Sequence, residues 1–318
     1  MEKVTERAMG EICRSWGIDP GMLAFLGGGR GDSDGILYTF PSPRGRMVLK
    51  ILARGEADVE GLAALELRAR FAHHLGESGI PVACPLRGTD GSLYAQCVDA
   101  GFRYVGLVMD YREGHTAENA ELTDAFARAW GRVTGRAHRA AKTFREGDVP
   151  ALNYERELND FTNLCADADA KAAWREMGAF LEGLPRTTDD YGFIHNDNHQ
   201  RNILTGDDGI AFIDFDCAMR QFFLHDLTTP LQGLMFEEAG GMLSPVQNER
   251  RLSRFLLNFV DGYEHENHLD GLWYERIGEF VNYRRLLLFT VMQDWLSTQP
   301  ELKRGFLRNI RKPPVIRL

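Results

Sequence analysis

One polar segment between short apolar runs constrains the fold of this chain more than any other part of the sequence. It extends from Tyr191 to Arg220 and reads YGFIHNDNHQRNILTGDDGIAFIDFDCAMR. The apolar residues on either side of the polar loop, together with the turn at residues 206–209, predict a strand, a tight loop, a second strand, a turn and a third strand. The third strand ends at Asp214-Phe215-Asp216.

The polar side chains of this segment stand at the ends of short strands, where their oxygen atoms can converge. Asp197, Asn202 and Asp214 offer carboxylate and amide oxygens, which are the ligands that a hard cation such as Mg2+ prefers. One carboxylate would remain to act on a hydroxyl group. A transition-metal site built from His195, Asp197 and His199 is an alternative, although no cysteine ligand lies nearby. For His195, a structural role within the loop is favoured.

The spacing H-x-D-x4-N, with I-D-F-D beginning shortly after, resembles the aminoglycoside phosphotransferase / choline kinase family. Members of that family are small-molecule kinases with the protein-kinase fold. The resemblance implies that Asp197 is the catalytic aspartate and that Asn202 and Asp214 hold Mg2+ on ATP. It also implies that Asp226 braces the catalytic loop. The spacing from Asp197 to Asn202 matches the catalytic loop of protein kinases as well.

A glycine-rich stretch near the N-terminus, LGGGRGDSDGILYTF, suits a loop that folds over a nucleotide. Gly28 and Gly29 lie within it, and glycine lets backbone amides approach phosphate oxygens. The stretch matches neither the kinase form of G-x-G-x-x-G nor the Walker pattern, so an ordinary glycine-rich hairpin is the alternative. The later catalytic loop is what favours the nucleotide-binding interpretation.

A lysine inside an apolar, strand-like run is a second nucleotide-binding signal. Lys50 lies within residues 47–52, where a lysine is costly unless its ammonium group reaches a partner. The resemblance implies that Lys50 touches the α- and β-phosphates and pairs with a glutamate on the following helix. We assign this glutamate as Glu66 rather than Glu60, on a helix predicted for residues 59–75. The alternatives are an edge-strand lysine and a surface glutamate.

The expected fold is α+β, a two-lobed protein-kinase-like fold. Residues 1–108 form a small antiparallel β lobe that binds nucleotide, with strands expected at 82–86, 92–97 and 104–109. Residues 109–114 resemble the hinge, where backbone groups of Met109 and Tyr111 would bind adenine. Residues 115–318 form a larger, mainly helical lobe that carries the catalytic and acceptor-binding residues, and the nucleotide is expected in the cleft between the lobes. One helix of the larger lobe is expected at residues 273–296.

Charge and composition narrow the classes of partner. The 318-residue chain has a formal net charge of -9, which disfavours a general nucleic-acid-binding role. No apolar run approaches the ~20 residues needed to span a membrane, and the charged N-terminus lacks the apolar core of a signal peptide. The 5 cysteines are widely spaced without a C-x-x-C pair, which fits reduced thiols and a cytoplasmic location.

The expected reaction is ATP- and Mg2+-dependent transfer of the γ-phosphate to a hydroxyl of a small molecule, such as an aminoglycoside or an amino alcohol. One alternative is a nucleotide-binding pseudokinase that regulates a partner, which the complete set of catalytic residues disfavours. Another is a protein kinase. The short segment between Asp214 and Asp226 lacks an APE-like sequence, and Asp216 replaces the glycine of D-F-G, so a protein substrate is disfavoured.

Three residues depart from the pattern of the family. Asn196 stands where glycine is usual, and Cys217 takes a position often held by an acidic residue. Arg201 replaces a small or polar residue and adds a positive charge beside the site of phosphate transfer. None of the three removes a proposed catalytic atom.

Overall fold

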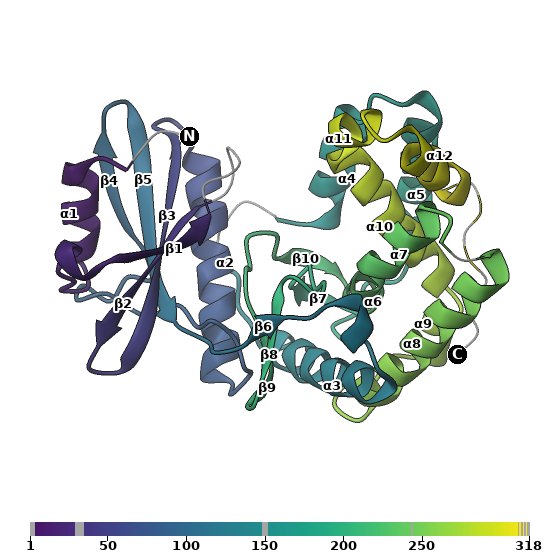
Figure 1. Cartoon of the computed structure of the whole chain (residues 1–318), viewed down its shortest axis with the longest axis horizontal. Helices are drawn as coiled ribbons and strands as arrows, with labels where there is room; N and C mark the ends of the chain where they lie inside the picture. The colour runs from purple at the N-terminus through teal and green to yellow at the C-terminus, as the bar shows by residue number, and fades with distance from the viewer. Residues whose placement is uncertain are drawn as a thin grey trace. The chain divides into compact units, whose positions relative to one another are not determined.

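The protein is represented by a computed structural model that describes residues 4–28, 35–147, 152–242, 244–310, 312, 314 and 316. The chain forms two compact units. The first contains Met1–Glu113, Arg145–Pro150 and Asp214–Asp216, and the second contains Gly114–Phe144, Ala151–Ile213 and Cys217–Leu318. Among the described residues, the first unit contains one antiparallel sheet with two helices, and helices dominate the second, so the predicted α+β class is confirmed (Figure 1).

The first unit is built on a five-stranded sheet with strand order β1-β2-β3-β5-β4. All four neighbouring pairs of strands in this sheet run antiparallel. Its elements are α1 (Glu6–Arg14), a short 3-10 turn (Pro20–Met22), β1 (Ala24–Gly28), β2 (Ile36–Ser42), β3 (Gly45–Gly55), α2 (Val59–Glu77), β4 (Ala95–Asp99) and β5 (Phe102–Asp110).

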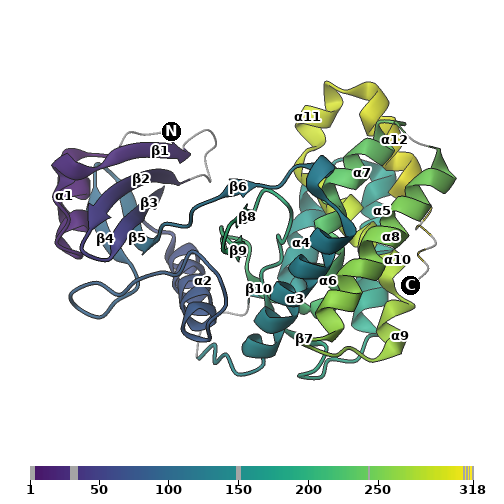
Figure 2. The same cartoon turned by 60° about the horizontal axis from the view of Figure 1, so that its bottom comes forward.

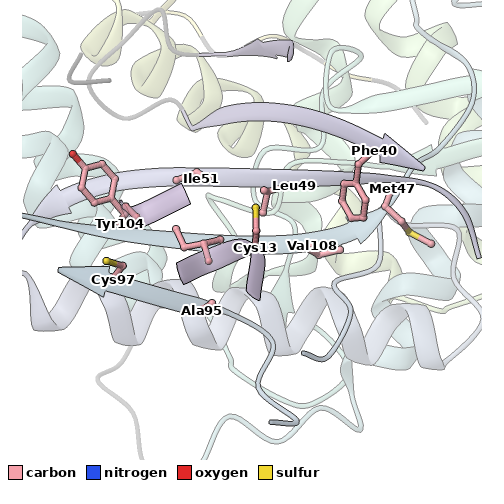
Figure 3. Close-up of a cluster of buried hydrophobic side chains, with 11 residues drawn as sticks. Cys13, Phe40, Met47, Leu49, Ile51, Ala95, Cys97, Tyr104 and Val108 are labelled. Carbon is pink, nitrogen blue, oxygen red and sulfur yellow. The ribbon is translucent and has the colours of Figure 1, made fainter. Parts of the chain in front are cut away.

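Side chains of β3 alternate between two hydrophobic layers, one on each face of the sheet. Met47, Leu49 and Ile51 pack in a buried cluster with side chains of α1 (Figure 3). Leu52, on the other face, packs with side chains of α2. Because successive side chains of a strand point to opposite faces, Lys50 leaves the sheet on the same face as Leu52. The strand therefore carries the lysine on its α2 face.

The strand expected at residues 82–86 is wrong. This segment forms no named strand within the described residues; an isolated bridge joins Pro85 to Met109 of β5. Leu86 donates its backbone N–H to Val108, and Asp110 donates to Cys84. Side chains, not a strand, meet two of its carbonyl oxygens: that of Pro85 lies 2.8 Å from His73 Nδ1, and that of Val82 accepts from Arg112 Nε at 2.7 Å.

The second unit contains two small sheets and a set of helices (Figure 2). The sheets have the strand orders β6-β8-β9 and β10-β7. Their strands are β6 (His115–Thr116), β7 (Tyr191–Ile194), β8 (Ile203–Gly206), β9 (Gly209–Phe212) and β10 (Met219–Phe222). The helices are α3 (Asp124–Ala141), α4 (Tyr154–Leu164), α5 (Ala168–Glu182), α6 (Phe223–Thr228), α7 (Gln232–Ala239), α8 (Pro245–Glu264), α9 (Gly271–Tyr274), α10 (Ile277–Val291), α11 (Gln293–Ser297) and α12 (Pro300–Ile310), with 3-10 turns at Asn119–Glu121 and Thr229–Leu231.

Helices α3 and α8 approach so closely that glycine is needed at their contact. A Cβ atom at Gly131 would lie 1.9 Å from the carbonyl oxygen of Phe259, and one at Gly262 would lie 2.0 Å from that of Arg128. The neighbouring Trp130 is fully buried and makes an edge-to-face contact with Phe259. Helix α3, packed in this way, contacts the loop that follows β7 through Trp130 and Thr134.

The single helix expected at residues 273–296 is instead three helices, α9, α10 and α11. After α9, the side chain of Arg276 donates to the carbonyl oxygen of Leu272 at 2.6 Å, which satisfies an acceptor at the end of that helix. The chain then restarts as α10. Within the described residues, no helix is both long enough and apolar enough to cross a lipid bilayer.

Candidate active site

The loop between β7 and β8 carries the predicted catalytic residues, and a buried carboxylate on α6 fixes its first turn. Asp226 is 2% exposed and accepts the backbone N–H of His195 at 3.0 Å and that of Asn196 at 2.8 Å. Burial favours a raised pKa for Asp226, but the His138 hydrogen bond and neighbouring imidazoles outweigh it and lower the pKa below its ordinary value. Asp226 therefore braces the loop as a carboxylate, which confirms its predicted structural role.

Hydrogen bonds of Asn198 and His195 also attach this loop to its surroundings. Trp130 on α3 donates its indole N–H to Asn198 Oδ1 at 2.8 Å, and Asn198 Nδ2 donates to Thr134 at 3.1 Å. The His195 ring nitrogen Nε2 lies 2.9 Å from the carbonyl oxygen of Ile213, the residue after β9. His195 therefore fixes the loop by hydrogen bonding, as expected.

The alternative of a transition-metal site in this loop lacks support. Within the part of the chain that the structure describes, no group of three His, Cys, Asp or Glu side chains has a metal-binding arrangement. His199 Nε2 does lie 3.4 Å from Asp197 Oδ2, as one partner of that carboxylate. His195 is engaged elsewhere through Nε2.

Asp197 and Asn202 lie side by side at the two ends of this loop. Asn202 Nδ2 donates to Asp197 Oδ2 at 2.8 Å and to the Asp197 carbonyl oxygen at 3.0 Å. The Asn202 backbone N–H donates to His199, which closes the turn between them. With its NH2 group used in this way, the Asn202 amide directs its oxygen elsewhere. That oxygen is the atom that suits a hard cation.

A buried arginine that the sequence analysis missed holds the other oxygen of Asp197. Arg284 on α10 is 3% exposed at its side chain and pairs through Nη2 with Asp197 Oδ1. Gln232 on α7 accepts from Arg284 Nε at 3.1 Å and fixes the guanidinium. Burial favours a raised pKa for Asp197, but the charge of Arg284 and the contact with His199 outweigh it and hold the pKa well below its usual range. Asp197 is therefore ionised.

The sequence did contain a signal for this arginine. Arg284 and Arg285 directly precede the apolar residues 286–289 of α10, and both are buried. A buried guanidinium requires a partner, and Arg285 has one in Glu238 on α7. Which carboxylate Arg284 would meet depends on tertiary contacts far apart in sequence.

The first unit brings Lys50 together with the two aspartates of I-D-F-D. Lys50 Nζ lies 2.6 Å from Asp216 Oδ2 and 3.2 Å from Asp214 Oδ1. Burial favours a lowered pKa for Lys50, but the charges of Asp216 and Asp214 outweigh it and leave the pKa raised. Asp214 has a φ of 59°, in the left-handed region that few residues other than glycine adopt. Lys50 is therefore a charged ammonium group that two carboxylates hold.

Glu66 contacts a tyrosine instead of Lys50, and Gly28 stands where the backbone requires glycine. Among the described residues Glu66 has the Tyr94 hydroxyl as its hydrogen-bond partner, at 3.5 Å, and Lys50 pairs with Asp214 and Asp216 instead. Gly28 ends β1 with a φ of 86°, and a Cβ there would lie 2.0 Å from the carbonyl oxygen of Gly35. Only glycine fits that position. Gly29 lies outside the described residues.

The two expected hinge residues lie at the end of β5 and just beyond it. Met109 pairs with Val48 on β3, so part of its backbone belongs to the sheet. The Tyr111 N–H lies 3.4 Å from the carbonyl oxygen of Arg46, and the Arg46 guanidinium stacks 4.6 Å from the centre of the Tyr111 ring.

The cysteines differ in how far they are buried. All five lie within the described residues; Cys13, Cys84, Cys97 and Cys165 are buried, and Cys217 is exposed. Burial raises the pKa of Cys13 and of Cys84 to about 11. Cys217 directly follows Asp216 in the chain.

Comparison with known proteins places this arrangement in a family. The model of the phosphotransferase enzyme family matches residues 37–273. Amicoumacin kinase of Bacillus subtilis (strain 168) is 22% identical over 318 residues, which cover 96% of this chain and 91% of that protein.

Solved structures show the same fold. An amicoumacin kinase in complex with AMP-PNP, Ca2+ and Ami superimposes with a TM-score of 0.79 at 21% identity, over 95% of this chain and 92% of that one. A microcompartment-associated aminopropanol kinase has a TM-score of 0.70 at 17% identity, over 94% of each chain. The predicted protein-kinase-like fold is therefore confirmed. The chain belongs to the phosphotransferase enzyme family.

Proposed function

We propose that this phosphotransferase moves the γ-phosphate of ATP to a hydroxyl group of a small molecule, with Mg2+ as cofactor. The observation that carries the proposal is the pairing of Asp197 with Asn202 in one braced loop, next to a buried arginine. The pairing of Lys50 with Asp214 in the first unit supports it. These are the residue types that phosphoryl transfer needs to orient a hydroxyl and to neutralise phosphate charge.

Asp197 orients the acceptor hydroxyl and takes its proton. Because Arg284 and His199 keep the carboxylate ionised, it can accept a hydrogen bond from the hydroxyl at neutral pH. A carboxylate of low pKa is a weak base, so the proton moves late, when the oxygen is already bonding to the γ-phosphorus. The new P–O bond forms, the bond to the leaving oxygen of ADP breaks, and the proton passes to an oxygen of Asp197.

Asn202 and Asp214 are the proposed ligands for Mg2+. Their donor atoms are an amide oxygen and a carboxylate, the oxygen set that this cation prefers. The Asp214 side chain is 48% exposed and meets Lys50 through Oδ1, which among the described residues leaves its Oδ2 for a cation. The bound cation would neutralise phosphate charge and hold the phosphate groups in position.

Lys50 is the proposed contact to the nucleotide phosphates, and Glu66 is proposed to hold it there. The backbone near Gly28, Gly29, Met109 and Tyr111 is proposed to bind the nucleotide. The AMP-PNP and Ca2+ in the amicoumacin kinase structure support a nucleotide and a divalent cation for this chain. The ion pairs of Lys50 with Asp214 and Asp216 must then loosen as phosphate replaces one of the carboxylates.

A small acceptor is favoured over a protein. After Asp216 the chain enters β10 at Met219 and α6 at Phe223, and both elements are largely buried. This leaves no room for an extended segment that would bind a peptide, such as protein kinases place after their metal-binding aspartate. The amicoumacin and aminopropanol kinases, whose names specify small acceptors, support this choice.

The test is Mg-ATP-dependent ADP formation with a panel of aminoglycosides, amino alcohols, sugars and nucleosides. We expect at least one acceptor to give ADP and a phosphorylated product, and Asp197→Asn to abolish both while ATP binding persists. Asp208→Asn, in the exposed turn between β8 and β9, is the matched control and should retain full activity. Absence of ATP binding by the wild type would refute the proposal. Activity retained in Asp197→Asn would refute the assigned role of that residue.

A further inference from the structure

The residue before the catalytic aspartate adopts a backbone conformation that requires support. Asn196 has a φ of 66°, in the left-handed region, which asparagine tolerates better than most residues but still at a cost. The conformation of Asn196 sets the direction in which the backbone enters the next residue, Asp197. The Asn196 backbone N–H is held by Asp226 at 2.8 Å. A backbone contact alone does not explain why an amide side chain stands here, because glycine would adopt this conformation without strain.

The Asn196 side chain is buried and depends on one carboxylate. Asn196 is 1% exposed, and its Nδ2 donates to Glu157 Oε1 on α4 at 2.9 Å. Its Oδ1 is buried without a hydrogen-bond partner among the described residues. A buried amide that lost its last hydrogen bond would be strongly destabilised. Glu157 is therefore what allows this side chain to occupy its site.

Glu157 is itself held from the opposite side by a helix that supports the site. Glu157 is 8% exposed, and its Oε2 accepts the hydroxyl of Tyr283, the residue before Arg284 on α10. Both partners donate, so an ionised carboxylate matches them. Burial, together with the charge of Asp197, leaves the pKa of Glu157 raised above its ordinary value, although the two hydrogen bonds and Arg284 act in the opposite direction.

We propose that Glu157 is a positioning residue for phosphoryl transfer. It holds the Asn196 side chain, fixes the left-handed turn of the catalytic loop, and so orients Asp197 toward the acceptor hydroxyl. The effect on rate rests on the proposed kinase function. The effect on the loop itself does not. The competing explanation is that Glu157 serves only to join α4 to α10 through Tyr283.

A double-mutant cycle separates the two explanations. Glu157→Met removes both acceptor oxygens at similar volume, and Asn196→Gly removes the amide while keeping the left-handed turn accessible. With Asn196 present, we expect Glu157→Met to lower kcat roughly tenfold to a hundredfold, as loss of a charge-assisted hydrogen bond implies. When Glu157→Met is added to the Asn196→Gly variant, kcat should change by less than about threefold, because no buried amide remains to be satisfied.

Two additional variants test specificity. Glu157→Gln retains an acceptor oxygen for Asn196 and should recover most of kcat. Glu176→Met, on an exposed site of α5, is the matched control and should leave kcat unchanged. The KM for ATP should stay within about twofold throughout, because the Glu157 contacts involve neither Lys50 nor Asp214. An equal fall of kcat with and without the Asn196 amide, or no fall with Asn196 present, would overturn the proposal.

Amide hydrogen exchange of residues 194–202 provides a readout that needs no activity. Glu157→Met should accelerate exchange in this loop when Asn196 is present, and should have a smaller effect when combined with Asn196→Gly. If the wild type transfers no phosphate, the proposed function fails and exchange alone decides the role of Glu157. If the wild type is active but loop exchange does not depend on Glu157, the positioning role fails and the proposed function stands.

Discussion

His225 makes the stability of this protein depend on pH in a direction that can be calculated. The imidazole on α6 is fully buried, and its ring lies edge-to-face against Tyr283 with the centroids 4.8 Å apart. Neither ring nitrogen has a hydrogen-bond partner among the described residues. Burial, with the nearby charge of Arg284, lowers the pKa of His225 from 6.5 to about 4. The folded protein therefore keeps His225 neutral at pH values where the unfolded chain binds a proton.

The size of the effect follows from this difference. The interval from 6.5 to about 4, at about 1.4 kcal/mol for each pKa unit, corresponds to about 3 kcal/mol. Because the folded-state pKa is the lower one, unfolding takes up a proton. The stability that comes from keeping His225 neutral is therefore fully present above pH 6.5. It is lost as the pH falls toward 4, so the free energy of unfolding decreases over that range. Between pH 7 and pH 5 the loss amounts to about 2 kcal/mol.

His225→Phe keeps an aromatic ring and removes the titrating group. We expect its free energy of unfolding to fall less between pH 7 and pH 5 than that of the wild type, by about 2 kcal/mol. Urea unfolding followed by tryptophan fluorescence at several pH values measures this difference. His268→Gln is the control, since the His268 side chain is 80% exposed. Parallel pH profiles for the wild type and His225→Phe would refute the reasoning, because they would mean that His225 titrates alike in both states.

Three other substitutions test the charges around the site. Arg284→Gln removes the cation that keeps the pKa of Asp197 low, so the acid limb of the kcat/KM profile should move to higher pH; an unmoved limb would contradict this. Asp214→Asn should raise the Mg2+ concentration for half-maximal activity by about tenfold or more, measured by titrating metal into chelator-treated enzyme, and an unaltered Mg2+ requirement would exclude Asp214 as a ligand. Asp226→Asn should lower the free energy of unfolding by about 1.5–3 kcal/mol, since it weakens hydrogen bonds from two buried backbone N–H groups; an unchanged thermal midpoint would disprove the bracing role.

The contact between Asp197 and Asn202 was predictable because the two residues are close in sequence. A fixed spacing of five residues joins Asp197 to Asn202, and the structure places their side chains 2.8 Å apart. The alternation of β3 likewise predicts which side chains share a face with Lys50. The strand expected at residues 82–86 shows the limit of such patterns, since its apolar residues suggested a strand, whereas side chains of His73 and Arg112 meet two of its carbonyl oxygens.

Contacts between residues far apart in the sequence were harder to predict. Arg284 meets Asp197 across 87 positions, and Glu157 meets Tyr283 across 126. A charge beside apolar residues indicated a partner for Arg284, whereas Glu157 lies in the polar helix α4 and gave no such signal. The partner of Lys50 illustrates the same point. The resemblance to the family suggested Glu66, whereas the structure pairs Lys50 with Asp214 and Asp216, which lie 164 and 166 positions away.

The uneven burial of the thiols has a practical consequence for following this protein in solution. Cys217 is exposed next to Asp216, which contacts Lys50, whereas the other four thiols are shielded. A maleimide dye should therefore attach at one position in the unmodified sequence, with no cysteine to remove beforehand. If nucleotide phosphates draw Lys50 away from Asp216, the fluorescence of that dye would report the change directly, and the Cys217→Ser protein would provide the unlabelled reference.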